Sequence, residues 1–239
     1  MDIYAESDYP TANNISAVHQ NQLIQISKPG YWGNGTQRLE IAKLARDFGI
    51  EAGVLEKPLN HETAKANNVT PVIKHLVKTL AIEPKVIDEK FFLNIIDSGL
   101  SEEEYTEIIG VVSRITNIDL YARAIGAPLP QFPKPEIGNH SKERPPEAIK
   151  EDAWVSTIPN GPAGKEIGKD LYKGRPMPYI LRALSLVPDE CRSNMVLESC
   201  QYAELGRVLD FSYNHYDSLS RPQVEIIAGR VSALNECFY

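Results

Sequence analysis

Residues 101–126, SEEEYTEIIGVVSRITNIDLYARAIG, decide the fold class. Apolar residues recur in this segment at spacings of three and four, the pattern of an α-helix with one buried face. The predicted buried face consists of Tyr105, Ile108, Ile109, Val112 and Ile115. Ser101 and Glu104 have the spacing of a capping box, and Gly126 is a residue type that ends many helices. We therefore expect one long helix that other elements cover.

Two further helices are predicted in the same half of the chain. The first covers residues 36–49, with Thr36 as the candidate N-cap and Gly49 as the candidate stop. Its predicted buried face consists of Ile41, Leu44, Ala45 and Phe48. The second covers residues 70–82, because Thr70 followed by Pro71 suits the first turn of a helix.

The C-terminal part shows helical periodicity over residues 178–188, 190–211 and 220–235. Ser220 and Gln223 repeat the capping-box spacing at the start of the last segment. The apolar stripe of that segment consists of Val224, Ile227, Val231 and Leu234. No stretch alternates long enough to indicate a sheet, so the sequence predicts an all-α fold.

Composition excludes several classes of function. The net charge of -7, without a basic cluster, argues against nucleic acid as a partner. No apolar run reaches the roughly 18 residues of a membrane span, and the polar start MDIYAESDYP is not a signal peptide. We therefore predict a cytoplasmic protein with no membrane partner. Three cysteines do not make a disulfide framework, and Cys191 and Cys200 are expected to be small core residues.

Proline content divides the chain. Ten of the 17 prolines lie between Pro128 and Pro178, a stretch that cannot be helical throughout. Because this stretch also contains Trp154, Ile158 and Tyr172, we expect an ordered connector. The predicted organisation is an N-terminal extension, a first helical unit, a Pro-rich connector and a second helical unit, at residues 1–35, 36–136, 137–177 and 178–239.

Two internal alignments relate the two units. An offset of 119 places LSEEEYTEIIGVVS (100–113) on LSRPQVEIIAGRVS (219–232). An offset of 185 places RLEIAKLAR (38–46) on QVEIIAGRV (223–231), which pairs Glu40 with Glu225. Capped amphipathic helices resemble one another for packing reasons alone, so the residue pattern does not choose between the two alignments.

The C-terminal string RPQVEIIAGRVSALNECFY resembles the carboxymuconolactone decarboxylase superfamily and its AhpD-like alkylhydroperoxidases. Redox members of that family carry a glutamate, eleven residues, Cys-x-x-Cys and a histidine four positions further on. Glu225 and Cys237 have the glutamate-to-first-cysteine interval. Residues 35–49 and 99–135 are similar to an early and a late helix of the same domain type. The resemblance therefore implies two AhpD-like helical bundles in tandem, and it favours the offset of 185.

Both units depart from the family pattern. The first unit has Ala52 and Leu55 where redox members have the two cysteines, so it resembles a degenerate copy. In the second unit the second cysteine and the histidine would follow Tyr239, so this unit is expected to be incomplete and its chain inactive as a peroxidase.

The resemblance implies a thiol-dependent peroxidase that acts on hydroperoxides, is reduced by a dithiol protein and forms a homo-oligomer. It implies no metal or organic cofactor. Cys237 corresponds to the resolving cysteine and Glu225 to the distal end of a proton relay. Twelve residues of straight helix leave these two side chains about 120° apart, so a shared site requires the helix to break near Asn235.

Simpler interpretations stand beside this one. Glu225 alone is typical of a carboxylate near a helix start, and Cys237 alone is typical of a small apolar residue. The alternative functions are a non-redox lactone decarboxylase-type enzyme, against which the cysteine argues, and a non-catalytic oligomeric scaffold. The acidic residues of the long helix, Glu103, Glu104 and Glu107, are expected to face solvent.

Overall fold

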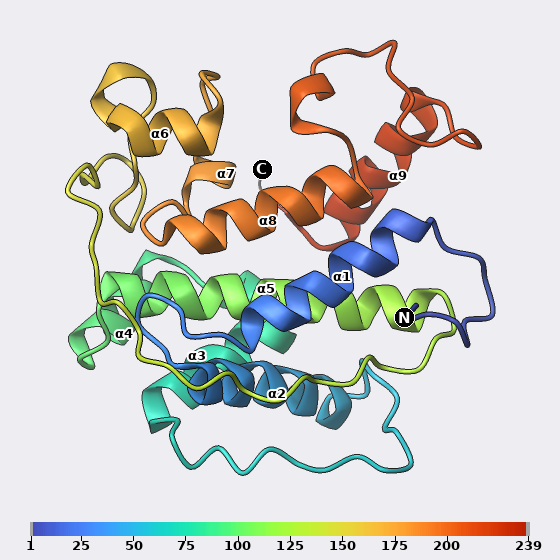
Figure 1. The fold of residues 1–239 in the computed structure, drawn as a ribbon, viewed down its shortest axis with the longest axis horizontal. Coiled ribbons are helices and arrows are strands. Elements are labelled where there is room, and N and C mark those ends of the chain that lie inside the picture. Colours follow the sequence, from blue (N-terminus) through green and yellow to red (C-terminus); the bar gives the residue numbers. More distant parts are fainter. Residues whose placement is uncertain (1, 238–239) are drawn as a thin grey trace.

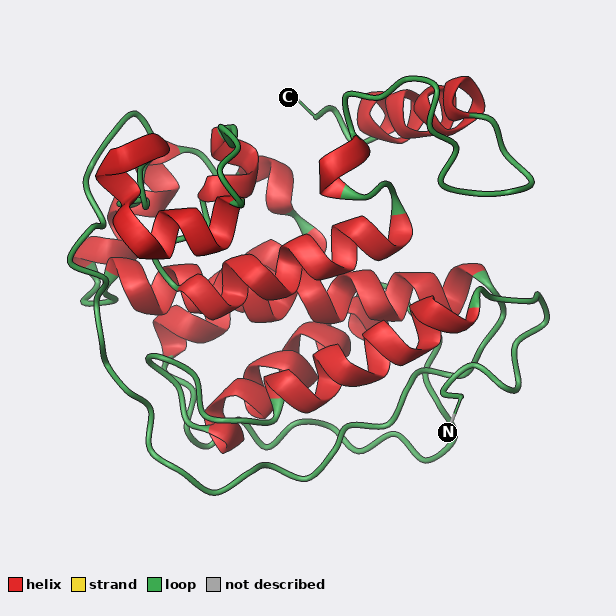
Figure 2. Cartoon of the chain, turned by 45° about the horizontal axis from the view of Figure 1, so that its top comes forward, coloured by secondary structure: helices red, strands yellow, loops and turns green. Residues whose placement is uncertain are grey.

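The computed structural model describes residues 2–237, and these form an all-α fold without a β-strand, as the sequence predicts (Figures 1 and 2). The α-helices are α1 (Asn13–Ile26), α2 (Gly35–Glu51), α3 (Pro71–Ile82), α4 (Glu89–Asp97), α5 (Glu102–Ala124), α6 (Lys165–Tyr172), α7 (Tyr179–Arg182), α8 (Pro188–Gln201) and α9 (Arg221–Leu234). Three short 3-10 helices are η1 (Pro84–Val86), η2 (Gly161–Gly164) and η3 (Leu205–Arg207).

Helix α5 is the centre of the molecule, between α2 and α3 on one side and α1 and α8 on the other (Figure 1). Its capping box forms as predicted, because Ser101 Oγ accepts the Glu104 N–H at 3.1 Å while Glu104 Oε2 accepts the Ser101 N–H at 3.0 Å. Gly126 follows the last turn with φ of +66°, a conformation that favours glycine. The predicted stripe of α5 is confirmed, with Ile109 only half-buried.

Helix α2 differs from the prediction at both ends. Asn34, not Thr36, is the N-cap, because its side chain accepts the Gln37 N–H and the Gln37 side chain accepts the Asn34 N–H. Gly49 does not stop the helix, which continues to Glu51. A Cβ at position 49 would lie 2.9 Å from a Leu55 methyl carbon, so this glycine permits close packing. The predicted buried face of α2 and the start of α3 are confirmed.

Helix α1 has no counterpart in the sequence prediction. It packs against α5 and α8, but its buried side includes the polar residues Ser16, His19 and Gln22, which interrupt the apolar period. Tyr4 Oη and His19 Nδ1 are hydrogen-bonded at 2.5 Å. Burial lowers the pKa of His19 to about 4, so the ring is neutral at pH 7.

The second half of the chain has a smaller core around α6, α7 and α8. Its buried members are Ile158, Leu171, Tyr172, Met177, Leu184, Cys191 and Met195. Ile158 and Tyr172, from the predicted connector, are fully buried, so this stretch is ordered as expected. Cys191 and Cys200 are buried, which confirms them as core residues.

Two of the helices predicted in this half are shorter than expected. Residues 178–188 contain only the four-residue α7, and α8 ends at Gln201 instead of continuing to Phe211. Side chains from the following loop bind carbonyl groups at the end of α8: His215 Nε2 lies 3.0 Å from the Cys200 oxygen, and the Tyr216 hydroxyl donates to the Gln201 oxygen. These contacts replace the helical hydrogen bonds that a longer α8 would make.

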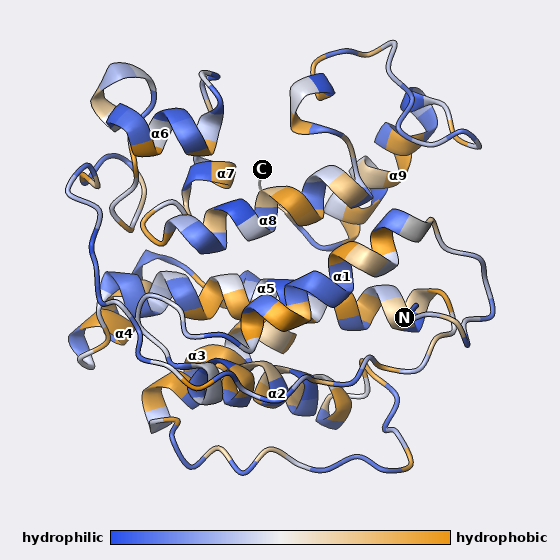
Figure 3. Ribbon diagram, viewed as in Figure 1, coloured by the Kyte–Doolittle hydropathy of each residue, from blue (hydrophilic) through white to orange (hydrophobic). Residues whose placement is uncertain are grey.

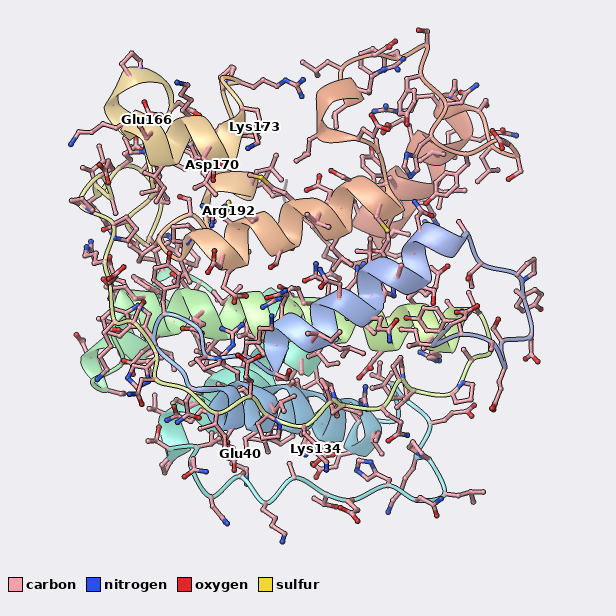
Figure 4. The ribbon with its side chains drawn as sticks, viewed as in Figure 1. Glu40, Lys134, Glu166, Asp170, Lys173 and Arg192 are labelled. Carbon is pink, nitrogen blue, oxygen red and sulfur yellow. The ribbon has the colours of Figure 1, made fainter. Side chains whose placement is uncertain are left out.

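An ionic contact joins α6 to α8 on the surface, where Asp170 accepts from Arg192 at 2.8 and 3.0 Å and from Lys173 at 2.9 Å (Figure 4). Such exposed pairs contribute little to stability, about 0–1 kcal/mol. Among residues 2–237, no helix combines the length and the apolar character that crossing a membrane requires.

Helix α9 lies at the edge of the molecule, beyond the end of α8 (Figure 2). The apolar residues of α9, orange in Figure 3, are mostly exposed to solvent. Val224 is buried, whereas the other three residues of the predicted stripe are more than half exposed. Helix α9 therefore contacts the rest of the fold chiefly through its first turn.

Candidate functional site

A buried cluster of four charged side chains lies where α2, α5 and α8 meet. Glu190 of α8 accepts from Arg38 of α2 at 2.8 Å and from Arg114 of α5 at 2.5 Å. Arg38 also pairs with Glu107 of α5. A Cβ at Gly110 would lie 2.8 Å from the Glu190 Cβ, so α5 requires glycine there for the acid to approach. The cluster connects segments that are far apart in the sequence.

The cluster contradicts the expectation that the acids of α5 face solvent. Glu107 is buried and also accepts the backbone N–H of Trp32 at 2.6 Å, and Glu103 is buried and bound by Arg144. Sequence periodicity missed these residues, because a carboxylate on the buried side of a helix is acceptable only where a distant cation meets it.

Burial and charge act in opposite directions within this cluster. Burial disfavours the ionised form of Glu190, but Arg114 and Arg38 outweigh it and lower the pKa. Burial raises the pKa of Glu107, against the opposing effect of Arg38. Burial also lowers the pKa of Arg114. The arrangement is typical of a structural ion cluster, because its charges are satisfied by one another and are closed to solvent.

Glu225, the predicted relay residue, lies in the first part of α9. Both of its carboxylate oxygens lie 2.8 Å from the Tyr202 hydroxyl, and Arg221, four residues earlier, also donates to it. The hydrogen bond from Tyr202 has the largest effect and lowers the pKa of Glu225; burial opposes it, and the contact with Arg221 lowers the pKa further. Glu225 is therefore an ionised carboxylate at neutral pH, with the Tyr202 hydroxyl hydrogen-bonded to it.

Cys237, the second predicted site residue, follows the end of α9. The helix stops at Leu234, Glu236 has φ of +53°, and the Cys237 N–H donates to the Ser232 oxygen at 2.9 Å. The predicted break near Asn235 is therefore confirmed. The Cys237 side chain is exposed, and the hydrogen bonds of Glu225 described above do not involve it. Phe238 and Tyr239 lie outside the described residues.

The corresponding region of the first unit is structural. Glu40, which the offset of 185 pairs with Glu225, accepts from the backbone and side-chain nitrogens of Asn68 at 3.0 Å each, away from α8 in the view of Figure 4. Ala52 is the C-cap of α2, and Leu55 is buried. No cluster of at least three His, Cys, Asp or Glu side chains within the described part of the chain is suited to a metal ion.

A large groove lies over α8, next to Tyr202 and its partner Glu225. Its volume is about 800 Å³, and its lining is mainly apolar, from the segment before α7, from α7, from α8 and from residues 205–209. Tyr202 lines the groove and also donates to Glu225, so it connects the groove to the predicted relay residue. Asn117 of α5 and Glu198 of α8 add polar groups to the lining.

Sequence reasoning missed Tyr202 and could have found Arg221. An arginine four residues before a glutamate on a helix is a recognisable ion-pair spacing. Tyr202 follows α8, and no local pattern connects it with α9, because their contact depends on the turn between the two helices.

Comparisons of this chain with protein-family models, curated proteins and solved structures give no match. The fold and the site geometry are therefore the basis for any statement about function.

Proposed function

We propose that Glu225 and Cys237 belong to a thiol-redox site of the AhpD type, which reduces organic hydroperoxides. The observation that carries this proposal is the end of α9 between the two residues, which releases Cys237 from the helix while Glu225 stays within it. The ionised state of Glu225 and its hydroxyl donor Tyr202 also support the proposal, because a relay needs a base with a partner that passes a proton.

The reaction balances as follows. A thiolate attacks the outer peroxide oxygen, the O–O bond breaks, and the leaving alkoxide takes a proton from the relay to become an alcohol. The resulting sulfenic acid condenses with the resolving thiol, here Cys237, forming a disulfide and releasing water. A dithiol protein then reduces this disulfide and is itself oxidised. The 239 residues include Cys237 but no attacking cysteine beside it, so they supply only the resolving step.

The proposal is tested by peroxide consumption. With cumene hydroperoxide and dithiothreitol, the 239-residue chain should be no faster than its Cys237→Ser variant. A chain extended after Tyr239 by Cys-Ala-Ala-Ala-His should consume peroxide catalytically, and Glu225→Gln should slow it by about 10²-fold, the usual size of a general acid–base contribution. If the extended chain folds, by circular dichroism, but shows no turnover, the proposal is wrong.

The uncovered apolar side chains of α9 favour a second candidate, an oligomeric scaffold. Contiguous exposed apolar surface commonly marks an interaction site. Sedimentation velocity should then show a self-associating chain, which Ile227→Ser with Val231→Ser converts to monomer. A chain that is monomeric at all concentrations contradicts this candidate and leaves the redox proposal untouched.

A further inference from the structure

Two hydrogen-bond acceptors in the groove over α8 have no partner among the described residues. Asn117 Oδ1 is buried without a hydrogen bond, and the Glu198 carboxylate makes no ion pair or hydrogen bond. Leaving an oxygen such as Asn117 Oδ1 buried and unpaired costs about 1–3 kcal/mol. Burial also raises the pKa of Glu198, as expected for a carboxyl group without a cation beside it.

The packing of α5 against α8 brings these two residues to the same part of the groove. Arg114 pairs with Glu190 near the start of α8, whereas Tyr121 lies within electrostatic range of Cys200 at its end. The two helices therefore run in the same direction. Asn117 lies between Arg114 and Tyr121, and thus alongside the part of α8 between Glu190 and Cys200, which includes Glu198.

Two of the nearby donors that line the groove are already engaged. Gln201 Nε2 lies 3.0 Å from His19 Nε2, and the Tyr202 hydroxyl donates to Glu225. Arg175 and Asn194 also line the groove, and neither donates to Asn117 Oδ1 or to the Glu198 carboxylate among the described residues. In this arrangement no described side chain donates to the two acceptors, so both are open to a donor from a ligand.

The rest of the groove is suited to an apolar body. Its apolar lining comes from α7 and the segment before it, from α8 and from residues 205–209. The apolar residues include Met177, Ile180, Leu181, Leu197, Leu205 and Val208. A volume of about 800 Å³ falls within the range of small-molecule sites, which combine apolar walls with a few polar groups that orient the ligand. The groove has this combination.

We propose that the groove over α8 binds a small molecule with an apolar body and a protonated primary amine, which donates to Asn117 Oδ1 and to the Glu198 carboxylate. An ammonium group has several N–H donors and so satisfies both acceptors, whereas a hydroxyl group donates only once. A carboxylate head offers no N–H or O–H donor and would place a second acidic group beside Glu198. The proposal is independent of the redox site at Glu225 and Cys237.

Isothermal titration calorimetry with three probes that share one body tests the proposal: 4-phenylbutylamine, 4-phenylbutanol and 4-phenylbutyrate, each with the full chain at pH 7. We expect the amine to bind about tenfold more tightly than the alcohol, the alcohol to bind weakly, and the carboxylate not to bind. Equal affinities for the three probes would overturn the choice of head group, and no binding of any probe would overturn the site itself.

Substitutions of residues that line the groove test where the amine probe binds. Ile180→Trp, at a half-exposed wall position, should abolish binding of the amine by filling the groove. Glu198→Gln should remove most of the preference for amine over alcohol, and Asn117→Leu should weaken both probes. Glu166→Gln, on exposed α6, is the matched control and should change nothing. Circular dichroism verifies that each variant is folded. An amine preference that survives in the folded Asn117→Leu, Glu198→Gln double variant contradicts the proposal.

Discussion

Helices α5 and α9 begin with the same type of capping box, but α5 is buried and α9 is mostly exposed. Each starts with a serine in a capping box, and the offset of 119 aligns Ile108 with Ile227 and Gly110 with Gly229. Ile108 is 3% exposed and Ile227 is 53% exposed. A Cβ at Gly110 would collide with Glu190, whereas a Cβ at Gly229 would meet nothing within 4 Å.

The difference separates helix formation from helix burial. A capping box and a suitable spacing of residues act within one turn, so both helices form. Burial requires partners from elsewhere in the chain, and only α5 has them, in α1, α2, α3 and α8. The same sequence pattern therefore gives the central helix in one place and a peripheral helix in another. Substitutions at matched positions should show this contrast.

The largest effect is expected from the acid that covers Gly110. Glu190→Ala leaves Arg114 and Arg38 without this carboxylate in a buried site, and removing one partner of a buried pair costs about 4 kcal/mol. Urea denaturation followed by circular dichroism measures the loss. Glu166→Ala, on the exposed surface of α6, is the control and should change stability by less than about 0.5 kcal/mol.

A double variant distinguishes the loss of this ion pair from a general loss of folding. Glu190→Ala combined with Arg114→Met should be less destabilised than the sum of the two single changes, because the second change removes one of the unpaired charges. Additive losses would contradict the idea that the two residues act as a pair.

Matched isoleucines give the next largest contrast. Ile108→Ala should lower the free energy of unfolding by about 3 kcal/mol, since it leaves a cavity in the core. Ile227→Ala, on uncovered α9, should change it by less than about 0.5 kcal/mol. The same denaturation experiment measures both. Equal losses would mean that α9 is covered in solution, for example by another copy of the chain.

The matched glycines should respond with opposite signs. Gly110→Ala forces the Glu190 side chain away and should cost about 1–3 kcal/mol, as overpacking usually does. Gly229→Ala meets no neighbour and should favour the helical state of α9 by up to about 1 kcal/mol. Thermal unfolding reports the first effect, and the far-UV helical signal of the folded chain reports the second. Two changes of the same sign would contradict the contrast.

The smallest effect concerns the pH dependence of the first turn of α9. The pKa of Glu225 is lowered from its ordinary 4.5, so its contribution is present above that pH and is lost as the pH falls through the lower folded-state pKa. Carboxyl carbon chemical shifts measured from pH 7 to 2 should show a titration of Glu225 below 4.5. In Tyr202→Phe the titration should move toward 4.5, because the hydrogen bond with the largest effect is gone. An unchanged titration in that variant would contradict the assignment.

Local signals in the sequence located the starts of α3, α5 and α9, misplaced that of α2, and were insufficient for tertiary contacts. The caps at Ser101, Thr70 and Ser220 are all present, because each depends on residues within one turn. Helix α1 was missed because its buried side is partly polar, and the end of α8 was misplaced because side chains of a later loop bind it.

Some features of the candidate site could likewise be predicted from the sequence, and others could not. The helix break before Cys237, which the family resemblance requires if Glu225 and Cys237 share a site, is present. The partners of Glu225, the groove over α8 and the ion cluster were not predicted, because each brings together residues from distant helices. Only the ion pair of Arg221 with Glu225 has a local signal that indicates it.

The ion cluster has a consequence for the order in which the helices can pack during synthesis. During synthesis, Arg38 and Arg114 emerge from the ribosome well before Glu190, the carboxylate that binds them both. Until α8 has been made, Arg114 has no carboxylate partner in its buried position, and the surface of α5 around Gly110 is uncovered. We therefore expect the N-terminal helices to complete their packing only after α8 has been translated.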